Sequence, residues 1–330
     1  MKRLLVRAGL IAAVAGLLLP VVAVAQPRTW EDGPPVPLGR IRYGHTQCPG
    51  DSGRFYVISG LDRTFNATIT TERFDIRTGA WEELAPVPEP SQAPTAVCVG
   101  NQIHLFGGGN RFGQATTHHY VYTVGDKAWT EAAPTPRPVV GAAAGGYGGR
   151  IYLAGGDNDF DQGGVTNEVD VYDIGTDRWV STTGRMPQAT DFAGSAQSGR
   201  FLYVVGGWDD NSPAANVRST QRLDTVTGIW STGPELPGAP ADFALVATGT
   251  ALFAVGGDAD GGEFKDASAT VRKLDLARWP AGNWISERDP LPASVAANNG
   301  GFATPDGRIW SLGGSTPGVG IGDSVFVKRP

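Results

Sequence analysis

The dominant pattern along the chain is a short apolar segment that ends in two small residues and occurs six times. The six copies span residues 55–60, 103–108, 151–156, 202–207, 252–257 and 309–314. Each ends in Gly-Gly, except the first, which ends in Ser59-Gly60. Short apolar runs bounded by turn residues are typical of buried strands. The pattern therefore predicts six equivalent β-strands that recur at a nearly regular interval along the chain.

A tryptophan follows each of the first five segments at a similar distance, at positions 81, 129, 179, 230 and 284. The sixth segment has no following tryptophan, whereas Trp30 precedes the first segment. Trp30 lies as far before Gly60 as Trp284 lies before Gly314. We therefore expect the segment around Trp30 to be the missing outer strand of the last unit. Such an exchange closes a ring of sheets and leaves neither terminal edge unpaired.

Composition supports an all-β chain. The 47 glycines and 24 prolines make up about 22% of the 330 residues, against about 12% in average proteins. Each interior glycine costs a helix about 1 kcal/mol, which argues against a helical bundle. A hydrophobic fraction of 41% argues against a disordered chain.

The N-terminus predicts export. Lys2, Arg3 and Arg7 precede an apolar run over 8–19, and 23–25 read Ala-Val-Ala before Gln26. This order is typical of a signal peptide over 1–25, leaving one domain over 26–330 in the periplasm or outside the cell. The apolar run is too short for a membrane anchor, so no membrane span is expected after cleavage.

Charge and cysteine content narrow the class of partner. Loss of the three N-terminal cations changes the formal net charge from −6 to −9, which disfavours nucleic acid as a partner. Cys48 precedes Gly60 and Cys98 precedes Gly108 by similar intervals, so the two cysteines belong to neighbouring units. A disulfide between them depends on whether their Cα atoms approach within about 7 Å, which the sequence does not decide.

The repeated unit resembles the kelch repeat, whose signature is a Gly-Gly pair followed by a tyrosine and a tryptophan. The clearest copy is Tyr172-Asp173 with Trp179, and Phe74-Asp75 with Trp81 keeps part of it. The resemblance covers 29–330 and implies a six-bladed β-propeller with four antiparallel strands per blade. We expect this propeller to be a monomer. In that fold the loop before each first strand and the loop after each Gly-Gly share one face.

That face gathers the candidate ligand-binding residues. They are Arg42, His45, Arg111, Asp157, Asp159, Asp191, Trp208, Asp209, Asp242, Asp258 and Asn298. Carboxylates, amides and aromatic rings suit a polar ligand such as a glycan, although loops are commonly polar without a function. Asp191 precedes Gly207 and Asp242 precedes Gly257 at nearly the same register. This predicts two carboxylates aimed at the channel, as acid and base or as acceptors for backbone groups.

The sequence gives only weak indications of a metal or cofactor site. Asp157, Asp159 and Asp161 with Glu168 imitate a calcium loop, but Gln162 replaces its essential glycine. His118 and His119 are adjacent on an expected strand, so they point to opposite faces and cannot chelate one ion together. His104 is expected between blades. We expect neither a resident metal nor another cofactor.

Two functions remain open from the sequence. The first is an exported propeller that binds a carbohydrate or another exported protein. The second is a sugar mutarotase resembling N-acetylneuraminate epimerase, with Arg42, His45, Asp191 or Asp242 as candidate catalytic residues. A copper oxidase such as galactose oxidase, which is built on a kelch propeller, is disfavoured because its Tyr-Cys and histidine ligands do not assemble here.

Overall fold

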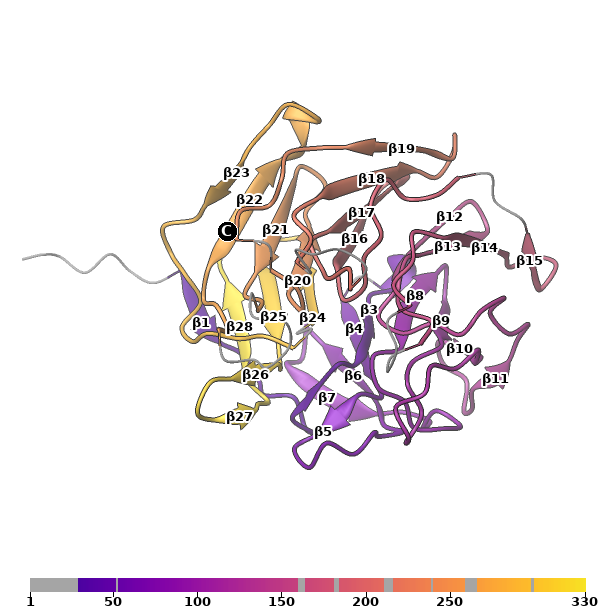
Figure 1. Cartoon of the computed structure of the whole chain (residues 1–330). Coiled ribbons are helices and arrows are strands. Elements are labelled where there is room, and N and C mark those ends of the chain that lie inside the picture. Colours follow the sequence, from indigo (N-terminus) through magenta and orange to yellow (C-terminus); the bar gives the residue numbers. More distant parts are fainter. Residues whose placement is uncertain are drawn as a thin grey trace, which may run out of the picture.

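Six four-stranded antiparallel sheets surround one axis, as the repeat predicts (Figure 1). The computed structural model describes residues 29–51, 53–159, 164–180, 184–210, 216–238, 240–258, 266–297 and 300–330. The expected signal peptide over 1–25 lies outside these ranges. Among the described residues, no helix is long and apolar enough to cross a membrane.

Each blade runs from an inner strand at the axis to an outer strand at the rim. Blade 1 consists of β3 (Gly44–Thr46), β4 (Arg54–Ile58), β6 (Thr71–Asp75) and β7 (Ala80–Glu83). Blade 2 consists of β8 (Thr95–Val99), β9 (Gln102–Phe106), β10 (His119–Thr123) and β11 (Thr130–Glu131). Blade 3 consists of β12 (Ala143–Tyr147), β13 (Arg150–Ala154), β14 (Val169–Asp173) and β15 (Arg178–Val180). Blade 4 consists of β16 (Gly194–Ser198), β17 (Phe201–Val205), β18 (Thr220–Asp224) and β19 (Ile229–Thr232). Blade 5 consists of β20 (Ala244–Ala247), β21 (Ala251–Val255), β22 (Val271–Asp275) and β23 (Trp284–Ser286).

The N-terminal strand completes blade 6, which confirms the predicted closure. Its sheet runs β24 (Gly300–Ala303), β25 (Ile309–Leu312), β28 (Val325–Lys328), β1 (Trp30–Asp32). Trp30 stands opposite Lys328, and Asp32 opposite Phe326. Pairing of β1 with β28 therefore joins the two ends of the chain within one sheet, which closes the ring of blades between blade 6 and blade 1.

Short pairs and turns complete the described elements. They are β2 (Arg40–Ile41) with β5 (Leu61–Asp62), β26 (Ser315–Thr316) with β27 (Gly320–Ile321), and the short 3-10 helices η1 (Pro49–Asp51) and η2 (Leu276–Arg278).

The repeated glycines join neighbouring blades. The second glycine of each pair has a left-handed backbone and donates its N–H to a carbonyl of the segment that enters the following blade, with blade 6 donating to blade 1. Gly207, for example, has φ of 92° and donates to Pro240 O at 3.1 Å. A Cβ on Gly207 would lie 2.3 Å from Asp191 O, so only glycine fits. The full set of donors is Gly60, Gly108, Gly156, Gly207, Gly257 and Gly314.

A second, inner circle of backbone bonds lies where each inner strand begins. One residue per blade has a left-handed φ of 44° to 68°: Arg42, Ala93, Gly141, Phe192, Asp242 and Ala297. In blades 1 to 5 this residue donates its N–H to the carbonyl of the equivalent residue in the preceding blade, at 2.6 to 3.3 Å. For blade 1 the preceding blade is blade 6. We call these six residues the axial circle. Only one of them is glycine, so the circle holds backbone strain that its hydrogen bonds offset.

Five of the six repeat tryptophans tie an outer strand to the blade before it. Trp81, Trp129, Trp179 and Trp284 donate their indole N–H to backbone carbonyls of the preceding repeat, at 2.9 to 3.3 Å. Trp30 makes the same bond to Asp289 O at 3.2 Å, which matches its place as the outer strand of blade 6. Trp30, Trp129 and Trp284 are buried, and Trp81 and Trp179 are partly buried against the core. These five tryptophans thus combine apolar packing with a hydrogen bond between blades.

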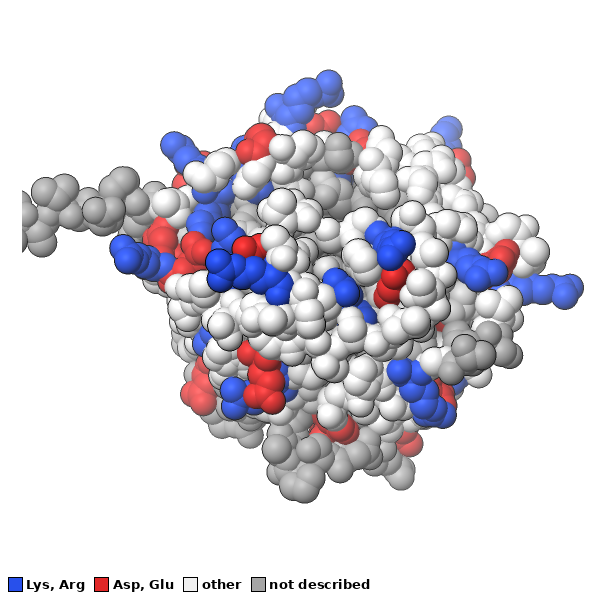
Figure 2. All heavy atoms as spheres, turned by 90° about the horizontal axis from the view of Figure 1, so that it is seen from above, with Lys and Arg blue, Asp and Glu red and all other residues white. Residues whose placement is uncertain are grey.

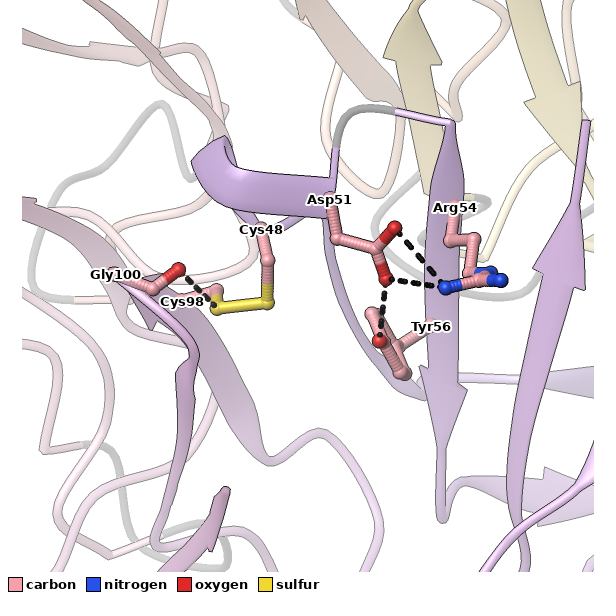
Figure 3. The surroundings of a disulfide bond; sticks show 6 residues. All are labelled: Cys48, Asp51, Arg54, Tyr56, Cys98 and Gly100. Carbon is pink, nitrogen blue, oxygen red and sulfur yellow. Dashed lines mark hydrogen bonds and ion pairs between the residues drawn. A yellow bond between two sulfur atoms is a disulfide. The ribbon is translucent and has the colours of Figure 1, made fainter. Parts of the chain in front are cut away.

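A disulfide links the inner strands of blades 1 and 2. Cys48 and Cys98 are bonded, with their Cα atoms 5.0 Å apart (Figure 3). Cys48 directly precedes η1, where Asp51 accepts from Arg54 and from the Tyr56 hydroxyl at 3.1 Å. The bond lies at the end of the inner strands opposite the axial circle, so it fixes two blades at the face that the circle does not reach.

Removal of Trp30 should weaken closure. Trp30 is buried in the core between blades 5 and 6, and truncation of a buried tryptophan costs about 3–5 kcal/mol. We expect Trp30→Ala to lower the free energy of unfolding by that amount in denaturant titration. Ile229→Ala, at an exposed outer-strand position, should change it by less than about 0.5 kcal/mol. Equal effects of the two variants would contradict the closure.

Removal of the disulfide should also destabilise the fold. The bond closes a loop with a sequence separation of 50 residues, for which chain entropy gives a stabilisation of about 4 kcal/mol, and measured effects are commonly about 2–4 kcal/mol. We expect the Cys48→Ala, Cys98→Ala double variant to unfold at lower denaturant concentration by that margin. Wild type in reductant should match it. A double variant as stable as the oxidised protein would show that the bond constrains nothing.

Candidate functional site

The two faces of the propeller differ. The mouth face carries the loops that precede the inner strands and those that follow the glycine pairs. The hairpin face carries the loops that join each inner strand to the second strand. All candidate ligand-binding residues were predicted for the mouth face, so their exposure there decides which of them a ligand can reach.

Most of the predicted carboxylates at the mouth are buried. Asp157, Asp191, Asp209, Asp242 and Asp258 are each less than 7% exposed, and Trp208 is buried beside them. Backbone bridges hold three of these carboxylates in place: Val140 with Asp157, Asp191 with Trp208, and Ala241 with Asp258. These five carboxylates present little surface to solvent at the mouth, whereas the sixth predicted carboxylate there, Asp159, is exposed.

Asp191 and Asp242 are not equivalent, contrary to the near-identical register read from the sequence. Asp242 is a member of the axial circle, and the equivalent residue of blade 4 is Phe192. Asp191 occupies the preceding position, equivalent to Ala241. Asp242 has a left-handed backbone, with φ of 51°, whereas Asp191 is held in a backbone bridge to Trp208. The two carboxylates do not form a symmetrical pair aimed at the channel.

Burial dominates the electrostatics of these carboxyls. It raises the pKa of Asp242 to about 6, against the opposing charge of Arg42, and Asp258 raises it further. Burial also holds the pKa of Asp191 well above its usual range, with Asp157, Asp210 and Asp242 adding to the effect. Both Asp242 carboxylate oxygens and Oδ1 of Asp191 lack hydrogen-bond partners among the described residues.

Arg42 counters this negative charge at the axis. Its Nη2 lies 3.9 Å from Oδ2 of Asp242, and its guanidinium lies 4.7 Å from the centre of the Phe192 ring. Arg42, Phe192 and Asp242 all belong to the axial circle, so the three side chains converge where the channel meets the mouth. They fill that end.

His45 lies inside the channel, on β3 just beyond the axial circle. It lines the cavity and contacts the Tyr43 ring edge-on, with centroids 6.0 Å apart. Burial lowers the pKa of His45 to about 4, so the imidazole is neutral at pH 7. It is a neutral hydrogen-bonding group there, on the channel side of the circle.

The other three histidines lie where the sequence predicts, and two of them make a contact that the sequence did not indicate. His119 is buried, and partly exposed His118 lies 3.5 Å from Glu89. His104 is buried between blades, and its Nδ1 lies 2.9 Å from Nε2 of His119. Nδ1 of His119 lies 2.9 Å from Ala133 O, which can only accept a hydrogen bond, so this nitrogen carries the proton. Nε2 of the neutral His119 ring is then the acceptor, and Nδ1 of His104 donates to it.

The proposed calcium loop is only partly described. Asp157 Oδ1 accepts the Asp159 N–H at 2.8 Å, and Glu168 is paired with Arg185 at 3.0 Å. Asp161 lies outside the described residues, as does the candidate Asn298. Within the described part of the chain, no group of three or more His, Cys, Asp or Glu side chains could hold a metal ion.

Two exposed loops on the mouth face carry phenylalanines that sequence reasoning missed. Phe65 in blade 1 is 65% exposed and Phe112 in blade 2 is 68% exposed. The predicted residue Arg111 is exposed beside Phe112, with its guanidinium 4.6 Å from the Phe112 ring. The available signal was a phenylalanine close after an arginine, in otherwise polar loops of two neighbouring repeats.

The two loops share one hydrogen-bond pattern. Asp62 Oδ1 accepts the N–H groups of Thr64 and Asn66 at 2.8 and 3.1 Å. Asn110 Oδ1 accepts those of Phe112 and Gln114 at 2.9 and 3.1 Å. By this register Phe65 is equivalent to Gly113, and both have left-handed backbones, with φ of 60° and 83°. Phe65 thus takes a conformation that suits glycine.

A cavity occupies the channel behind the axial circle. Its volume is about 560 Å³, and inner-strand residues line it from Ala93, Gly141 and Phe192 at the circle to Cys48, Tyr147 and Gly199 at the hairpin face. Tyr147 and Gly199 are exposed, so the cavity reaches solvent at that face.

The outer surface in Figure 2 shows cationic and anionic side chains interspersed over mostly uncharged surface.

Comparisons with known proteins agree with this architecture. The family described as the KLHDC2/KLHL20/DRC7 Kelch-repeats domain matches residues 44–257. Kelch-like protein terF of Aspergillus terreus (strain NIH 2624 / FGSC A1156) is 25% identical over 336 residues, covering 94% of this chain and 72% of that protein. Kelch-like protein 34 of Homo sapiens is 27% identical over 173 residues, covering 50% of this chain and 25% of that protein.

The buried Asp242 should make stability depend on pH in a defined direction. Its folded pKa of about 6 exceeds its unfolded value of 3.8, so its contribution is fully present below pH 3.8 and is lost as pH rises through 6. The loss amounts to about 3 kcal/mol at about 1.36 kcal/mol per pKa unit. Asp242→Asn should therefore be more stable relative to wild type at pH 8 than at pH 4, by about 1–3 kcal/mol, in denaturant titrations.

The matched control is Asp126→Asn, at an exposed turn, which should show no such change between the two pH values. A relative stability of Asp242→Asn that is the same at pH 4 and pH 8, or higher at pH 4, would contradict the burial of an ionisable Asp242.

Proposed function

This chain belongs to the kelch-repeat family, and on that premise we propose that it is an exported propeller that binds a partner protein through the loops of Phe65 and Phe112. Kelch propellers are generally binding scaffolds. The observation that carries the proposal is the pair of exposed phenylalanines, held in loops of the same geometry on two neighbouring blades.

The loops have the properties of a preformed docking surface. Aromatic side chains and arginine are the residues that most often anchor protein interfaces. The Asp62 and Asn110 side chains fix the backbone of each loop, so binding costs little ordering of the chain. The left-handed backbone of Phe65 adds a second sign, since strained positions persist mainly at functional sites.

The chemistry of the loops indicates the chemistry of the partner. Arg63 is already paired with Asp323 of blade 6 at 2.9 Å. Arg111 stacks on Phe112 and presents its guanidinium to solvent. A partner surface with an apolar pocket beside a carboxylate would complement Phe112 and Arg111 together.

Support for export comes from two separate features. The order of basic, apolar and small residues over 1–25 is that of a signal peptide. The Cys48–Cys98 disulfide is of a kind that persists in oxidising compartments such as the periplasm or the extracellular space.

Binding is favoured over the mutarotase alternative because of where the carboxyls lie. Ring-opening of a sugar needs an acid and a base within hydrogen-bond reach of the anomeric centre. Asp191 and Asp242 are buried beneath the mouth, and Arg42 is engaged with Asp242 at 3.9 Å. The exposed groups on the mouth face include Phe65, Phe112 and Arg111, which suit a docking surface, besides the carboxylates of Asp159 and Asp210.

A glycine substitution tests the docking surface without harming the fold. Phe65→Gly fits the left-handed backbone, so we expect it to leave stability unchanged or to raise it by about 1 kcal/mol. The Phe65→Gly, Phe112→Ala double variant, immobilised, should fail to retain proteins that wild type captures from the periplasmic or secreted fraction of the source cells. Retention should fall at least tenfold.

The control is Ile285→Ala, which removes an exposed apolar side chain from the outer strand of blade 5. It should retain the same proteins as wild type. Capture of the same proteins by the double variant would refute the docking surface. So would wild-type binding on a glycan array, or sugar anomerisation above the buffer rate by NMR, that the double variant leaves intact.

A further inference from the structure

The central channel is closed at the mouth and open at the hairpin face. At the mouth, the backbone bonds of the axial circle bring the inner strands together, and the side chains of Arg42, Phe192 and Asp242 converge there. At the other end, the lining reaches the exposed residues Tyr147 and Gly199. A small molecule would therefore reach the cavity from the hairpin face, on the opposite side from the docking loops.

The lining of the cavity is uncharged. The described residues that form it include no Asp, Glu, Lys or Arg. Its apolar part is formed by the partly exposed methyl groups of Ala96, Ala142, Ala144 and Ala196, with the buried side chains of Phe192, Phe243 and Leu245 behind them. Its polar part includes His45, Thr46 and Ser195. The depressed pKa of His45 keeps its imidazole neutral above about pH 4, so the lining remains uncharged at pH 7.

The rim of the cavity is held open by links between blades. The Cys48–Cys98 disulfide joins blades 1 and 2, and both cysteines line the cavity. Gln197 joins blades 3 and 4, because its Oε1 accepts the Gly146 N–H and its Nε2 donates to Gly146 O, both at 2.7 Å. A rim fixed in this way loses little freedom when a ligand binds.

We propose that this channel is a second binding site, which takes an uncharged small molecule with an aromatic or other flat apolar face and one or a few hydroxyl groups. The volume of about 560 Å³ lies within the usual range for small-molecule sites. A charged ligand would lose its hydration with no ion to pair with it. A neutral ligand loses less and can lay a flat apolar face against the alanine methyl groups while its hydroxyl groups bond to the neutral polar groups.

The test uses three probes that share a naphthalene ring and carry a small neutral, anionic or cationic head group. They are 2-naphthalenemethanol, 2-naphthoate and 2-naphthylmethylammonium, titrated at pH 7 by ligand-observed NMR and calorimetry. We expect the neutral alcohol to bind at least tenfold more tightly than either ion. Equal affinity for the three probes, or failure of the alcohol to bind up to its solubility limit, overturns the proposal and leaves the channel as a water-filled space.

Blocking variants assign the binding to the channel. Ala144 lines the cavity on β12, so Ala144→Phe should abolish binding of the alcohol, whereas Ala80→Phe, on exposed β7, should not change it. Ser195→Leu is the second blocking variant, for use should Ala144→Phe unfold. The Phe65→Gly, Phe112→Ala variant should bind the alcohol like wild type, so this site and the docking surface can fail independently. Binding that survives both blocking variants overturns the proposal.

Discussion

Backbone hydrogen bonds between neighbouring blades are the constraint on which the rest of this structure depends. Packed blades need a contact that fixes their angle, and here it is made by main-chain groups on two circles at the mouth. The outer circle uses the second glycine of each pair, whose N–H reaches the next blade. The inner circle uses one left-handed residue per blade. Because main-chain groups form these bonds, the side chains of the inner circle are free to differ.

This freedom explains how the mouth acquires its chemistry. The inner circle holds Arg42, Ala93, Gly141, Phe192, Asp242 and Ala297. Three of these carry large or charged side chains that meet at the axis and close it, and the carboxyl of Asp242 is buried as a result. The same closure separates two surfaces. Loops that follow the glycines project outward and carry Phe65 and Phe112, while the channel communicates with solvent on the far side.

The architecture could be predicted from the sequence because the glycine and tryptophan positions recur once per blade. Each residue type has a fixed structural role. The glycine fits a left-handed turn that a Cβ would block, and the tryptophan bonds to the previous blade. The closure by Trp30 was predicted for the same reason. A period also locates loops, so the candidate Arg111 and the face on which it lies could be placed.

What the period does not determine is the side on which a residue points. Asp191 and Asp242 differ by a single position in register, and only Asp242 takes the left-handed backbone of the axial circle. The pairing of His104 with His119 needs the distance between two strands, which residue spacing alone does not give. Phe65 was overlooked because its significance lies in its exposure and its left-handed backbone, both of which are three-dimensional properties.

Amide hydrogen exchange of the two circles tests the central claim most directly. The amides of Gly156, Gly207, Phe192 and Asp242 donate the inter-blade bonds described above. If those bonds hold the blades together, these amides exchange only when the whole propeller unfolds, with the same opening free energy as the central strands β17 and β21. Exchange of these amides on the timescale of the exposed loop amides, while β17 and β21 stay protected, would contradict the account.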